Sequence, residues 1–414
     1  MKRLAVLSLA ALLVAAFTVP AAALESQFGG YWRTRAYTMQ NFTGEDQTEG
    51  MDWSGVDTRA RLYYTAVFHE NLKFVNKFEW DAVWGDTTLG DIGSDGKSLE
   101  IKNSYADFNL GPVNFKIGIQ GVAIARGFLF DDDFSGAMVT YKGNNIEVPF
   151  LWVKAYEGYN LGYGKDNNNV DVDYYGILPI ISIGESMSLN PFFLYAYSKD
   201  ASSWPSTASY EKMRLFYAGL NLDVTASDIA AIWFTGIYQG GDADTIGGGC
   251  VDFAAYLLAA GLDLDFSRVN FHMQAFYATG DDDADKDMET FFVPKGQSYY
   301  WAEIMGFGIF DREVSANSPG DQIGNIMASN IGLKFKASDK LSISCDLWGA
   351  MFAEDNAAGE DYLGAEVDLK LTYKLVEGLT LDVVGAYLFT GEATYEGSDE
   401  ADPYEVGTRL SLKF

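Results

Sequence analysis

Apolar and polar residues alternate along long stretches of the chain, with the period of two that a half-buried β-strand requires. In residues 58–68 the apolar side of the alternation runs from Ala60 to Phe68, and in residues 72–84 apolar residues alternate with lysine and acidic residues. The pattern recurs over residues 113–120, 269–277, 341–347 and 363–373. Many stretches exceed the five or six residues of ordinary soluble strands. They predict an all-β fold, a transmembrane antiparallel β-barrel.

Short and long joins between these stretches alternate. Short joins lie at residues 69–72, 110–112, 142–145, 184–186, 225–228, 265–267, 337–340 and 375–378. Long polar joins lie near residues 40–56, 86–98, 121–134, 159–170, 199–210, 240–250, 281–325, 354–360 and 391–403. Outer-membrane barrels have short periplasmic turns and long external loops. Eight turns and nine loops predict 18 strands, with both chain ends in the periplasm. Sixteen strands is the alternative, because the period blurs in PFLWV and ILPIISI.

The two ends of the chain carry further signals. Residues 1–23 have a basic start, an apolar stretch and the small residues AAA before a cleavage site, which indicates a Sec signal peptide and a barrel domain over residues 24–414. A membrane anchor is the alternative, but the apolar run is shorter than the ~20 residues of a spanning helix. The final GTRLSLKF is expected to close the barrel against the first strand, since an open edge in lipid leaves backbone groups unpaired. Phe414 also resembles the terminal aromatic that the barrel-assembly machinery recognises.

Composition narrows the function classes. The formal net charge of −29 excludes nucleic acid as a partner, and 48% hydrophobic residues exclude a disordered chain. There are two histidines, His69 and His272, and both are expected near periplasmic turns, far from the outer rim where barrel enzymes place their sites. We therefore expect no enzyme activity and no cofactor, and CxxCH haem motifs are absent from the sequence.

Five ordered segments carry a resemblance to a known family. They are VWGDTTLGDIGSDGKSLEIKNSYADF, FKIGIQGVAIARGFLFDDDFSGAMV, ATGDDD, VPKGQSYYWAEIMGFGIFD and DKLSISCDLWGA. Together they resemble the outer-membrane homotrimeric porins of sulfate-reducing bacteria, from about residue 28 to the C-terminus, with no counterpart for residues 199–250. The resemblance implies a homotrimeric, water-filled channel that small solutes or ions cross, in an outer membrane of lipid and lipopolysaccharide.

Seven basic residues are expected on the inward face of neighbouring strands. Arginine keeps its charge, so such a cluster requires water, anions or facing carboxylates. We interpret these residues as a basic wall of the pore. The alternative is local pairing with Glu79, Asp81 and Glu405. The basic residues are Arg33, Arg35, Arg59, Arg61, Lys73, Lys77 and Arg409.

Two of the long loops are too apolar for open solvent. The loop at 121–134 contains FLF at 128–130 and is expected to fold into the barrel, where Arg126 and the three aspartates 131–133 (Asp131, Asp132, Asp133) would face the arginines. Opposed charges of this kind orient solutes at a constriction. An external loop that covers its neighbours is the alternative. The segment 291–310 is expected either to form a second constriction or to contact a neighbouring subunit.

Two further groups of residues suggest sites. Asp281, Asp283, Asp285 and Asp287 alternate as hard-cation ligands do, so a weak calcium site is a hypothesis, with a solvated acidic loop as the alternative. Cys250 and Cys345 are predicted near opposite ends of their strands, beyond the ~7 Å that a disulfide allows. We expect two free thiols.

The sequence thus favours an outer-membrane porin for passive diffusion of small hydrophilic or ionic solutes. An alginate-export-like or other substrate-specific 18-stranded channel for anionic solutes is the alternative. We expect weak ion selectivity, because inward carboxylates oppose the arginines. These carboxylates are Asp107, Asp346, Asp368 and Asp382.

Overall fold

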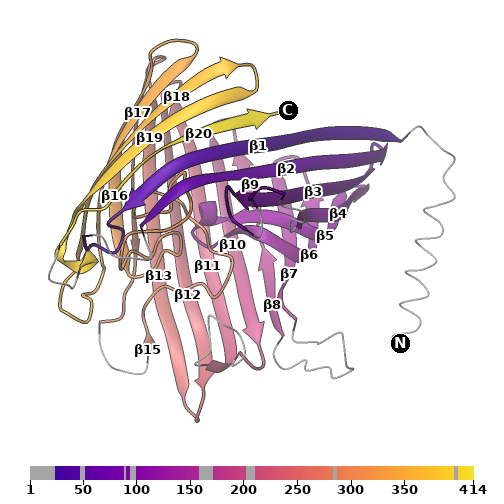
Figure 1. The fold of residues 1–414 in the computed structure, drawn as a ribbon. Helices are drawn as coiled ribbons and strands as arrows, with labels where there is room; N and C mark the ends of the chain where they lie inside the picture. The colour runs from indigo at the N-terminus through magenta and orange to yellow at the C-terminus, as the bar shows by residue number, and fades with distance from the viewer. Residues whose placement is uncertain are drawn as a thin grey trace.

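The computed structural model describes residues 24–46, 52–87, 90–93, 99–157, 171–201, 210–282, 287–395 and 400–414. The expected signal peptide, residues 1–23, lies outside these residues. The described strands form one antiparallel sheet that closes on itself (Figure 1). Among the described residues, no helix has the length and apolar character to cross a membrane.

The strands follow one another around the wall in chain order. Their bounds are β1 (Glu25–Gln40), β2 (Trp53–His69), β3 (Leu72–Val83), β4 (Glu100–Leu110), β5 (Val113–Ile124), β6 (Phe130–Lys142), β7 (Ile146–Tyr156), β8 (Val172–Ile177), β9 (Ile180–Ile183), β10 (Met187–Ser198), β11 (Tyr210–Ser227), β12 (Ala230–Thr245), β13 (Cys250–Asp265), β14 (Val269–Ala278), β15 (Asp287–Met288), β16 (Ile326–Lys336), β17 (Leu341–Met351), β18 (Tyr362–Val376), β19 (Leu379–Thr390) and β20 (Tyr404–Lys413). Two 3₁₀ turns are η1 (Ala125–Gly127) and η3 (Glu392–Thr394).

The described strands make an 18-stranded wall, as the sequence predicts. β8 and β9 are two pieces of one wall strand, because both pair with β7 and with β10. The break falls at Leu178 and Pro179, within the ILPIISI segment where the alternation blurs, and Pro179 has no N–H to donate. β15 makes only a two-residue parallel pairing with β13, beside the barrel wall.

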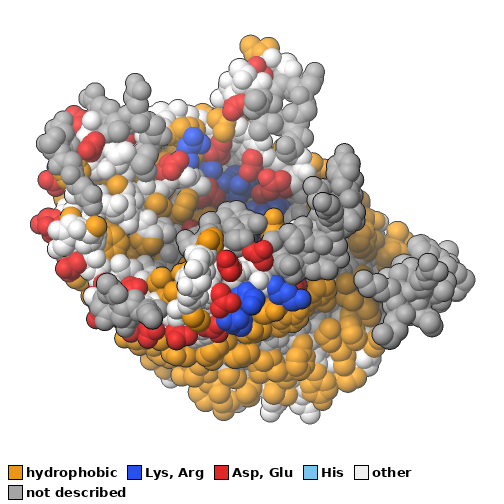
Figure 2. Space-filling model, turned by 90° about the horizontal axis from the view of Figure 1, so that it is seen from below, with side chains coloured by type: hydrophobic (Ala, Val, Ile, Leu, Met, Phe, Trp, Pro, Cys, Tyr) orange, Lys and Arg blue, Asp and Glu red, His pale blue; other side chains and the backbone are white. Residues whose placement is uncertain are grey.

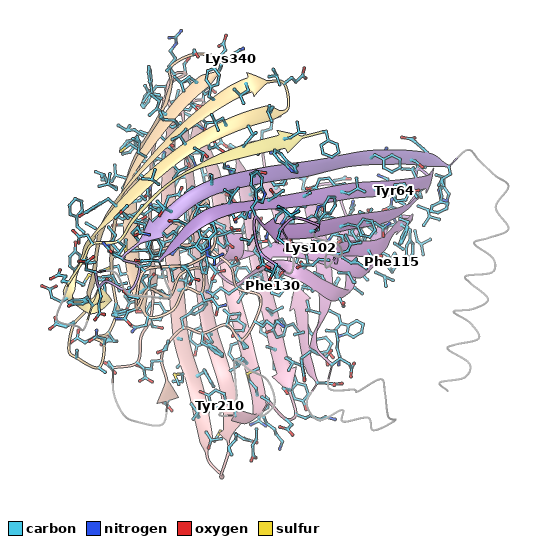
Figure 3. The ribbon with its side chains drawn as sticks, in the orientation of Figure 1. Tyr64, Lys102, Phe115, Phe130, Tyr210 and Lys340 are labelled. Atoms are coloured by element: carbon cyan, nitrogen blue, oxygen red, sulfur yellow. The ribbon has the colours of Figure 1, made fainter. Side chains whose placement is uncertain are left out.

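The eight short joins lie where the sequence predicts them, at one end of the barrel. Examples are the turns between β2 and β3 and between β16 and β17. The start of β1 and the end of β20 lie at this same turn end. Lys340 marks the turn end and Tyr210 the opposite, loop end (Figure 3).

The two faces of the wall differ in exposure. On β13, Tyr256 and Leu258 are 43% and 45% exposed, whereas Ala255 and Leu257 are fully buried. The exposed set forms an apolar outer surface, and charged side chains gather in the hollow of the barrel (Figure 2). This separation of faces is that of a barrel with lipid outside and water inside.

The last strand closes the wall against the first, as predicted. β20 pairs with β1 from Gln40 and Tyr404 to Tyr31 and Lys413. Beyond this ladder, the Phe414 carbonyl accepts a hydrogen bond from the Gly30 N–H at 2.8 Å. A Cβ atom on Gly30 would lie 2.4 Å from the Phe414 ring, so the closing contact requires glycine at this position.

We predict that a charge on the outer surface destabilises the barrel. Ile331, in the middle of β16, is 53% exposed on the outer face. Ile331→Arg should cost about 2–4 kcal/mol of unfolding free energy, because the guanidinium enters hydrocarbon. Ser411→Arg, on the inner face, is the matched control and should cost little. Urea titration in lipid vesicles checks this, and equal losses for the two variants would contradict the assignment of faces.

Candidate channel lumen

Residues 289–325, here called the inner segment, fold into the barrel and cross its interior. Its backbone is bonded to strands on several sides: the Tyr217 hydroxyl of β11 donates to the Phe292 carbonyl at 2.7 Å, and the Tyr174 hydroxyl of β8 donates to the Lys295 carbonyl at 3.2 Å. On the other side, the Ile304 N–H donates to Glu366 of β18 at 2.6 Å. The segment therefore packs within its own barrel, which favours the constriction over contact with a neighbouring subunit.

Apolar side chains fill the interior on the side of β8 to β14 and β17. Trp301 of the inner segment packs edge-on against Phe276 of β14 and Trp348 of β17, with ring centroids 5.5 and 5.2 Å apart. The buried hydrophobic side chains of the inner segment are Phe291, Val293, Trp301, Ala302, Ile304, Met305, Phe310 and Ile323. This side of the barrel is a packed core, so water has room mainly on the other side.

The tip of the β5–β6 hairpin, residues 120–134, leaves the wall and enters the lumen. β4 pairs with β5 only as far as Ile119, and β7 pairs with β6 only as far as Ser135, while β5 and β6 stay paired up to Ile124 and Phe130. At the tip, Arg126 forms an ion pair with Asp223 of β11 and lies over the Trp233 ring of β12 at 4.7 Å. The hairpin tip thus reaches across the lumen to β11 and β12.

This geometry corrects the prediction of a loop over 121–134. Residues 121–124 belong to β5, and 130–134, with the three aspartates, belong to β6. The connection is only the turn around η1, where Ala125 and Arg126 have φ of 53° and 61°. Alternation of polar and apolar residues is lost here because the hairpin tip has lumen on both sides, so the period-two signal of a lipid-facing strand disappears.

The hairpin tip and the inner segment form one packed body. The Ser298 N–H donates to the Gly127 carbonyl at 3.2 Å, and the Asp131 N–H donates to the Gly296 carbonyl at 2.7 Å. The Phe128 and Tyr299 rings stack with centroids 3.7 Å apart. Phe130 and Lys102 lie in this interior region (Figure 3). The two inner elements therefore support each other.

Asp311 of the inner segment lies against three arginines of the wall. Its carboxylate accepts from Arg33 at 3.2 Å, pairs with Arg35, and lies 3.8 Å from Arg59. Arg35 also pairs with Asp57 at 2.8 Å. Arg33 and Arg35 are only 7% and 6% exposed, so their charges hold the inner segment to the wall. Asp311 itself has φ of 36°, a conformation that these contacts must maintain.

Three more of the predicted basic residues form ion pairs with nearby carboxylates. Arg59 pairs with Asp81 at 2.6 Å and Arg61 with Glu79, which is the local pairing named as the alternative. Arg409 pairs with Asp382 at 2.8 Å.

The two predicted lysines and Glu405, the third possible acidic partner, remain to be placed. Lys77 lines the same cavity as Arg59 and Arg61, whereas Lys73 is exposed near the turn end, away from them. Glu405, named as a further partner, is buried and its carboxylate oxygens have no hydrogen-bond partner among the described residues.

A cavity of about 1130 Å³, here called the outer cavity, lies between the wall and the inner elements towards the loop end. Asp131, Asp132 and Asp133 of the hairpin tip line it opposite the arginines, and Asp133 pairs with Lys102 of β4 at 3.1 Å. Its acidic lining is Glu79, Asp81, Glu100, Asp131, Asp132, Asp133, Asp311 and Asp321, and its basic lining is Arg59, Arg61, Lys77, Lys102, Lys116 and Lys295.

A second cavity of about 1060 Å³, here called the inner cavity, extends to the turn end at Gly30 and Phe414. Its basic lining is Arg33, Arg59, Arg61, Lys334, Lys370, Arg409 and Lys413, and its acidic side chains are Asp311 and Asp382. Both cavities are lined by Arg59, Arg61, Tyr300 and Asp311. These four residues mark where the two cavities meet.

Sequence reasoning missed several lining residues. Lys334 and Lys370 lie on the inward face of β16 and β18, and their position in the alternation was a signal that could have placed them in the lumen. Asp311 and Tyr300 carry no such signal, because they lie in a segment without regular structure. Only the fold of the inner segment brings them to the arginines.

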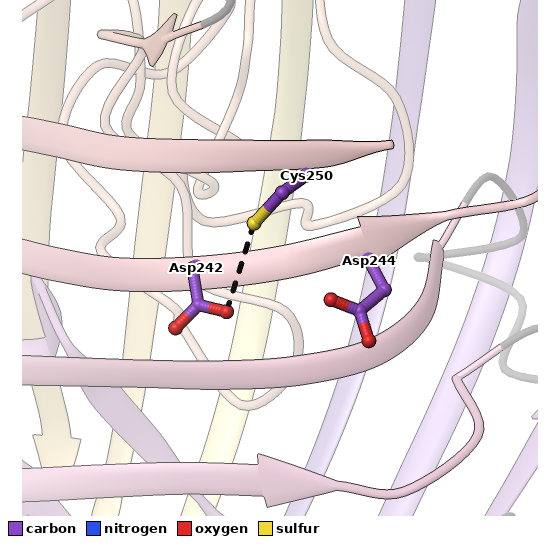
Figure 4. Close-up of side chains that lie close together, drawn as sticks. All are labelled: Asp242, Asp244 and Cys250. Atoms are coloured by element: carbon purple, nitrogen blue, oxygen red, sulfur yellow. Dashed lines mark hydrogen bonds between the residues drawn. The ribbon is translucent and has the colours of Figure 1, made fainter. Parts of the chain in front are cut away.

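Among the described residues, one group of acidic and cysteine side chains has the spacing of metal ligands, and it lies at the loop end. Asp242, Asp244 and Cys250 place ligand atoms within 4.8 Å of one another (Figure 4), but Arg214 already pairs with both carboxylates. Asp281 and Asp287 do not join such a group among the described residues, and Asp283 and Asp285 lie outside them. The calcium site stays a hypothesis. Both cysteines are free and exposed, as expected.

We predict that Asp311 stabilises the fold far more than an exposed acid does. Asp311→Asn leaves the buried Arg33 without its carboxylate partner, which should cost about 3–5 kcal/mol. Asp81→Asn removes a partner from the more exposed Arg59 and should cost about 0–1 kcal/mol. Urea unfolding of the two variants in detergent measures the difference. Losses of similar size would show that the contact with Asp311 is not structural.

Comparison with known proteins gives a structural likeness only. No protein-family model matches the chain, and no curated protein matches it by sequence. Solved structures that match include OccAB3 of Acinetobacter baumannii, with a TM-score of 0.61, 10% identity, and coverage of 94% of this chain and 100% of that one.

Two further matches come from Pseudomonas aeruginosa. OpdK with vanillate has a TM-score of 0.58, 13% identity and coverage of 94% of this chain and 98% of that one. OccK8 (OprE) has a TM-score of 0.58, 12% identity and the same coverage.

The chain therefore shares its fold with these proteins, and another OpdK match is described as an outer membrane protein. A closed 18-stranded barrel with an apolar outer face belongs in the outer membrane. The resemblance to porins of sulfate-reducing bacteria stays a prediction, since the structural likeness does not test it.

Proposed function

We propose that the protein is an outer-membrane porin through which small hydrophilic or ionic solutes diffuse passively. The observation that carries this proposal is the pair of large cavities that meet at Arg59, Arg61, Tyr300 and Asp311. Together they run from the loop end to the turn end, beside the packed core. Tyr300 is 50% exposed, so its ring borders the path at the junction.

The charges along this path favour anions in its inner half. The outer cavity carries acidic and basic residues in similar number, whereas the inner cavity is mainly basic. Lys334, Lys370 and Lys413 form no ion pair with any described residue, so their charges act on the solute. Low-dielectric walls focus such a field and raise the local anion concentration. We therefore propose moderate anion preference, in place of the weak selectivity expected from the sequence.

A substrate-specific channel for anionic solutes is the second candidate. OpdK, which shares the fold, was crystallised with vanillate, a small aromatic carboxylate. Here the inner cavity places Tyr31, Tyr63 and Tyr300 beside arginines, a combination that suits an aromatic anion. The basic lining comes from β1, β2, β16, β18 and β20 on both sides of the β1–β20 junction. A polyanion path, as in an alginate exporter, would require basic residues around the whole circumference.

The family resemblance also implies assembly partners. We propose a homotrimer in lipid and lipopolysaccharide, inserted by the barrel-assembly machinery through the strand that ends at Phe414. Cross-linking of the protein in native outer-membrane vesicles tests the trimer.

We predict that three lysines set the ion preference. In planar bilayers with a KCl gradient, the wild-type protein should give a reversal potential of the sign for chloride. Replacing Lys334, Lys370 and Lys413 together by glutamine should shift the preference several-fold towards potassium, because the inner cavity loses three positive charges.

Lys340→Gln supplies the control for this measurement. Lys340 lies in the exposed turn between β16 and β17, outside both cavities, and should leave the reversal potential unchanged. A purified wild-type protein without channel activity would refute the porin. Channel activity with an unchanged reversal potential in the triple variant would refute the role of the lysines.

We also predict that the hairpin tip limits conductance. Replacing residues 122–132 by an Asn-Gly turn should raise single-channel conductance, since these residues form one side of the outer cavity. Shortening the external loop at 356–359 is the control and should have no effect. Unchanged conductance after removal of the hairpin tip would place the narrowest point elsewhere.

A further inference from the structure

Four carboxyl groups meet where the inner segment touches β18 and β20. They are Glu303 of the inner segment, Glu366 and Asp368 of β18, and Glu405 of β20. Glu366, Asp368 and Glu405 are 1%, 8% and 0% exposed. Glu303 and Asp368 border a small cavity of about 240 Å³ next to the inner cavity. None of these groups belongs to the lining of the solute path described above.

Three of the four groups hold the backbone of the inner segment. Glu366 accepts from the Ile304 and Met305 N–H groups at 2.6 and 2.9 Å. Asp368 accepts from the Glu303 N–H at 3.3 Å, and Glu303 in turn accepts from the Ile309 N–H at 2.5 Å. Residues 303–309 thus form a turn, here called the latch turn, that is fixed to the wall through carboxyl groups.

The cluster cannot be fully ionised as it stands. Both carboxylate oxygens of Glu405 and the Oδ1 atom of Asp368 are buried with no hydrogen-bond partner among the described residues. A buried ionised carboxylate without donors is strongly unfavourable, so these groups carry protons. The carboxyl groups of Asp368 and Glu366 are close neighbours, so a negative charge on one opposes ionisation of the other.

Neighbouring positive charges are too few to balance four ionised carboxyl groups. Arg35 of β1 is paired with Asp57 and Asp311, and Arg409 of β20 is paired with Asp382. Lys370 of β18 is the remaining nearby cation among the described residues, opposite four carboxyl groups. Two other titratable groups face the cluster: Asp346 of β17 and its partner His272 of β14. Asp346 adds further negative charge.

A metal ion does not fit the geometry of the cluster. Among the described residues, the group of three acidic or cysteine side chains with ligand atoms within 4.8 Å of one another is the one at Asp242, Asp244 and Cys250. The four carboxyl groups are therefore not spaced to coordinate one cation, and protons are left as the neutralising species.

We propose that this carboxyl cluster is a proton-dependent latch: while it holds protons, it fixes the latch turn to β18, next to Glu405 of β20, and its ionisation releases the turn. Tyr300 and Asp311, on either side of the latch turn, border both cavities. Release of the turn therefore widens the junction of the solute path. This effect on conductance rests on the proposed channel function, whereas the latch itself does not.

The direction of the pH dependence follows from proton linkage. Burial raises the pKa of Glu303, so docking of the latch turn takes up protons. The docked state is fully favoured below the ordinary pKa of a carboxyl group and is lost as the pH rises through the raised pKa. Between the ordinary and the raised pKa, each linked proton changes the docking equilibrium by about tenfold per pH unit.

Hydrogen exchange of the full-length protein in detergent tests the latch directly. The protection factors of the amides of residues 303–309, which already correct for intrinsic exchange, should fall at least about tenfold between about pH 5 and pH 9. Asp368→Asn with Glu405→Gln removes two of the four ionisable carboxyl groups and should reduce the fall. The single variant Glu405→Gln, which should reduce it less, serves if the double variant does not fold. Asp263→Asn, at an exposed acid of β13, is the control and should keep it.

The outcomes separate the latch from the channel. Protection that is independent of pH in the wild-type protein, or a fall of undiminished size in the double variant, would overturn the latch. Planar-bilayer conductance of the wild-type protein should rise over the same pH interval. A fall in protection without a rise in conductance would overturn the coupling between the latch and the solute path. A protein without any channel activity would refute the porin. The exchange result would still decide the latch in that case.

Discussion

A backbone N–H or C=O group that faces hydrocarbon has no water to bond, so the sheet must provide every partner itself. This constraint explains why β20 pairs with β1 and why the Phe414 carbonyl accepts a hydrogen bond from the Gly30 N–H. It also explains the alternation along each strand, since each residue must suit either lipid or the interior. The cavities, the charged wall and the inner elements all exist inside a cylinder that this pairing closes.

The closed wall leaves an interior that is too wide to be filled by strand side chains alone. The inner segment and the hairpin tip fill it unevenly. Towards β8–β14 they bury aromatic and aliphatic side chains in a core, and towards β1–β5 and β16–β20 they leave two cavities lined by charge. The extent of the cavities is therefore set by where the apolar residues of the inner elements pack, and the wall alone does not decide it.

Electrostatics divides the inward residues into those that hold the inner segment to the wall and those whose charges face the cavities. Arg33 and Arg35 are buried and fix the inner segment through Asp311, so their charges are largely balanced. Lysines that form no ion pair with any described residue lie towards the turn end, where their charges face the inner cavity. We propose that the buried acids around Glu405, which form no ion pair with any described residue, are balanced by protons. Inward residues of the same charge thus have different roles, because some are buried in ion pairs and others face a cavity.

The sequence by itself determined the wall: the 18 strands, the eight short turns, the closing strand and the inward set of arginines all follow from period-two alternation, which is a local property. It also marked the inner segment as too apolar for solvent. Only the tertiary structure decided that residues 121–134 are a hairpin that leaves the wall, that Asp311 meets Arg33, and that Glu303 joins Glu405. These contacts join residues far apart in the chain within segments that have no repeating pattern, so nothing local in the sequence encodes them.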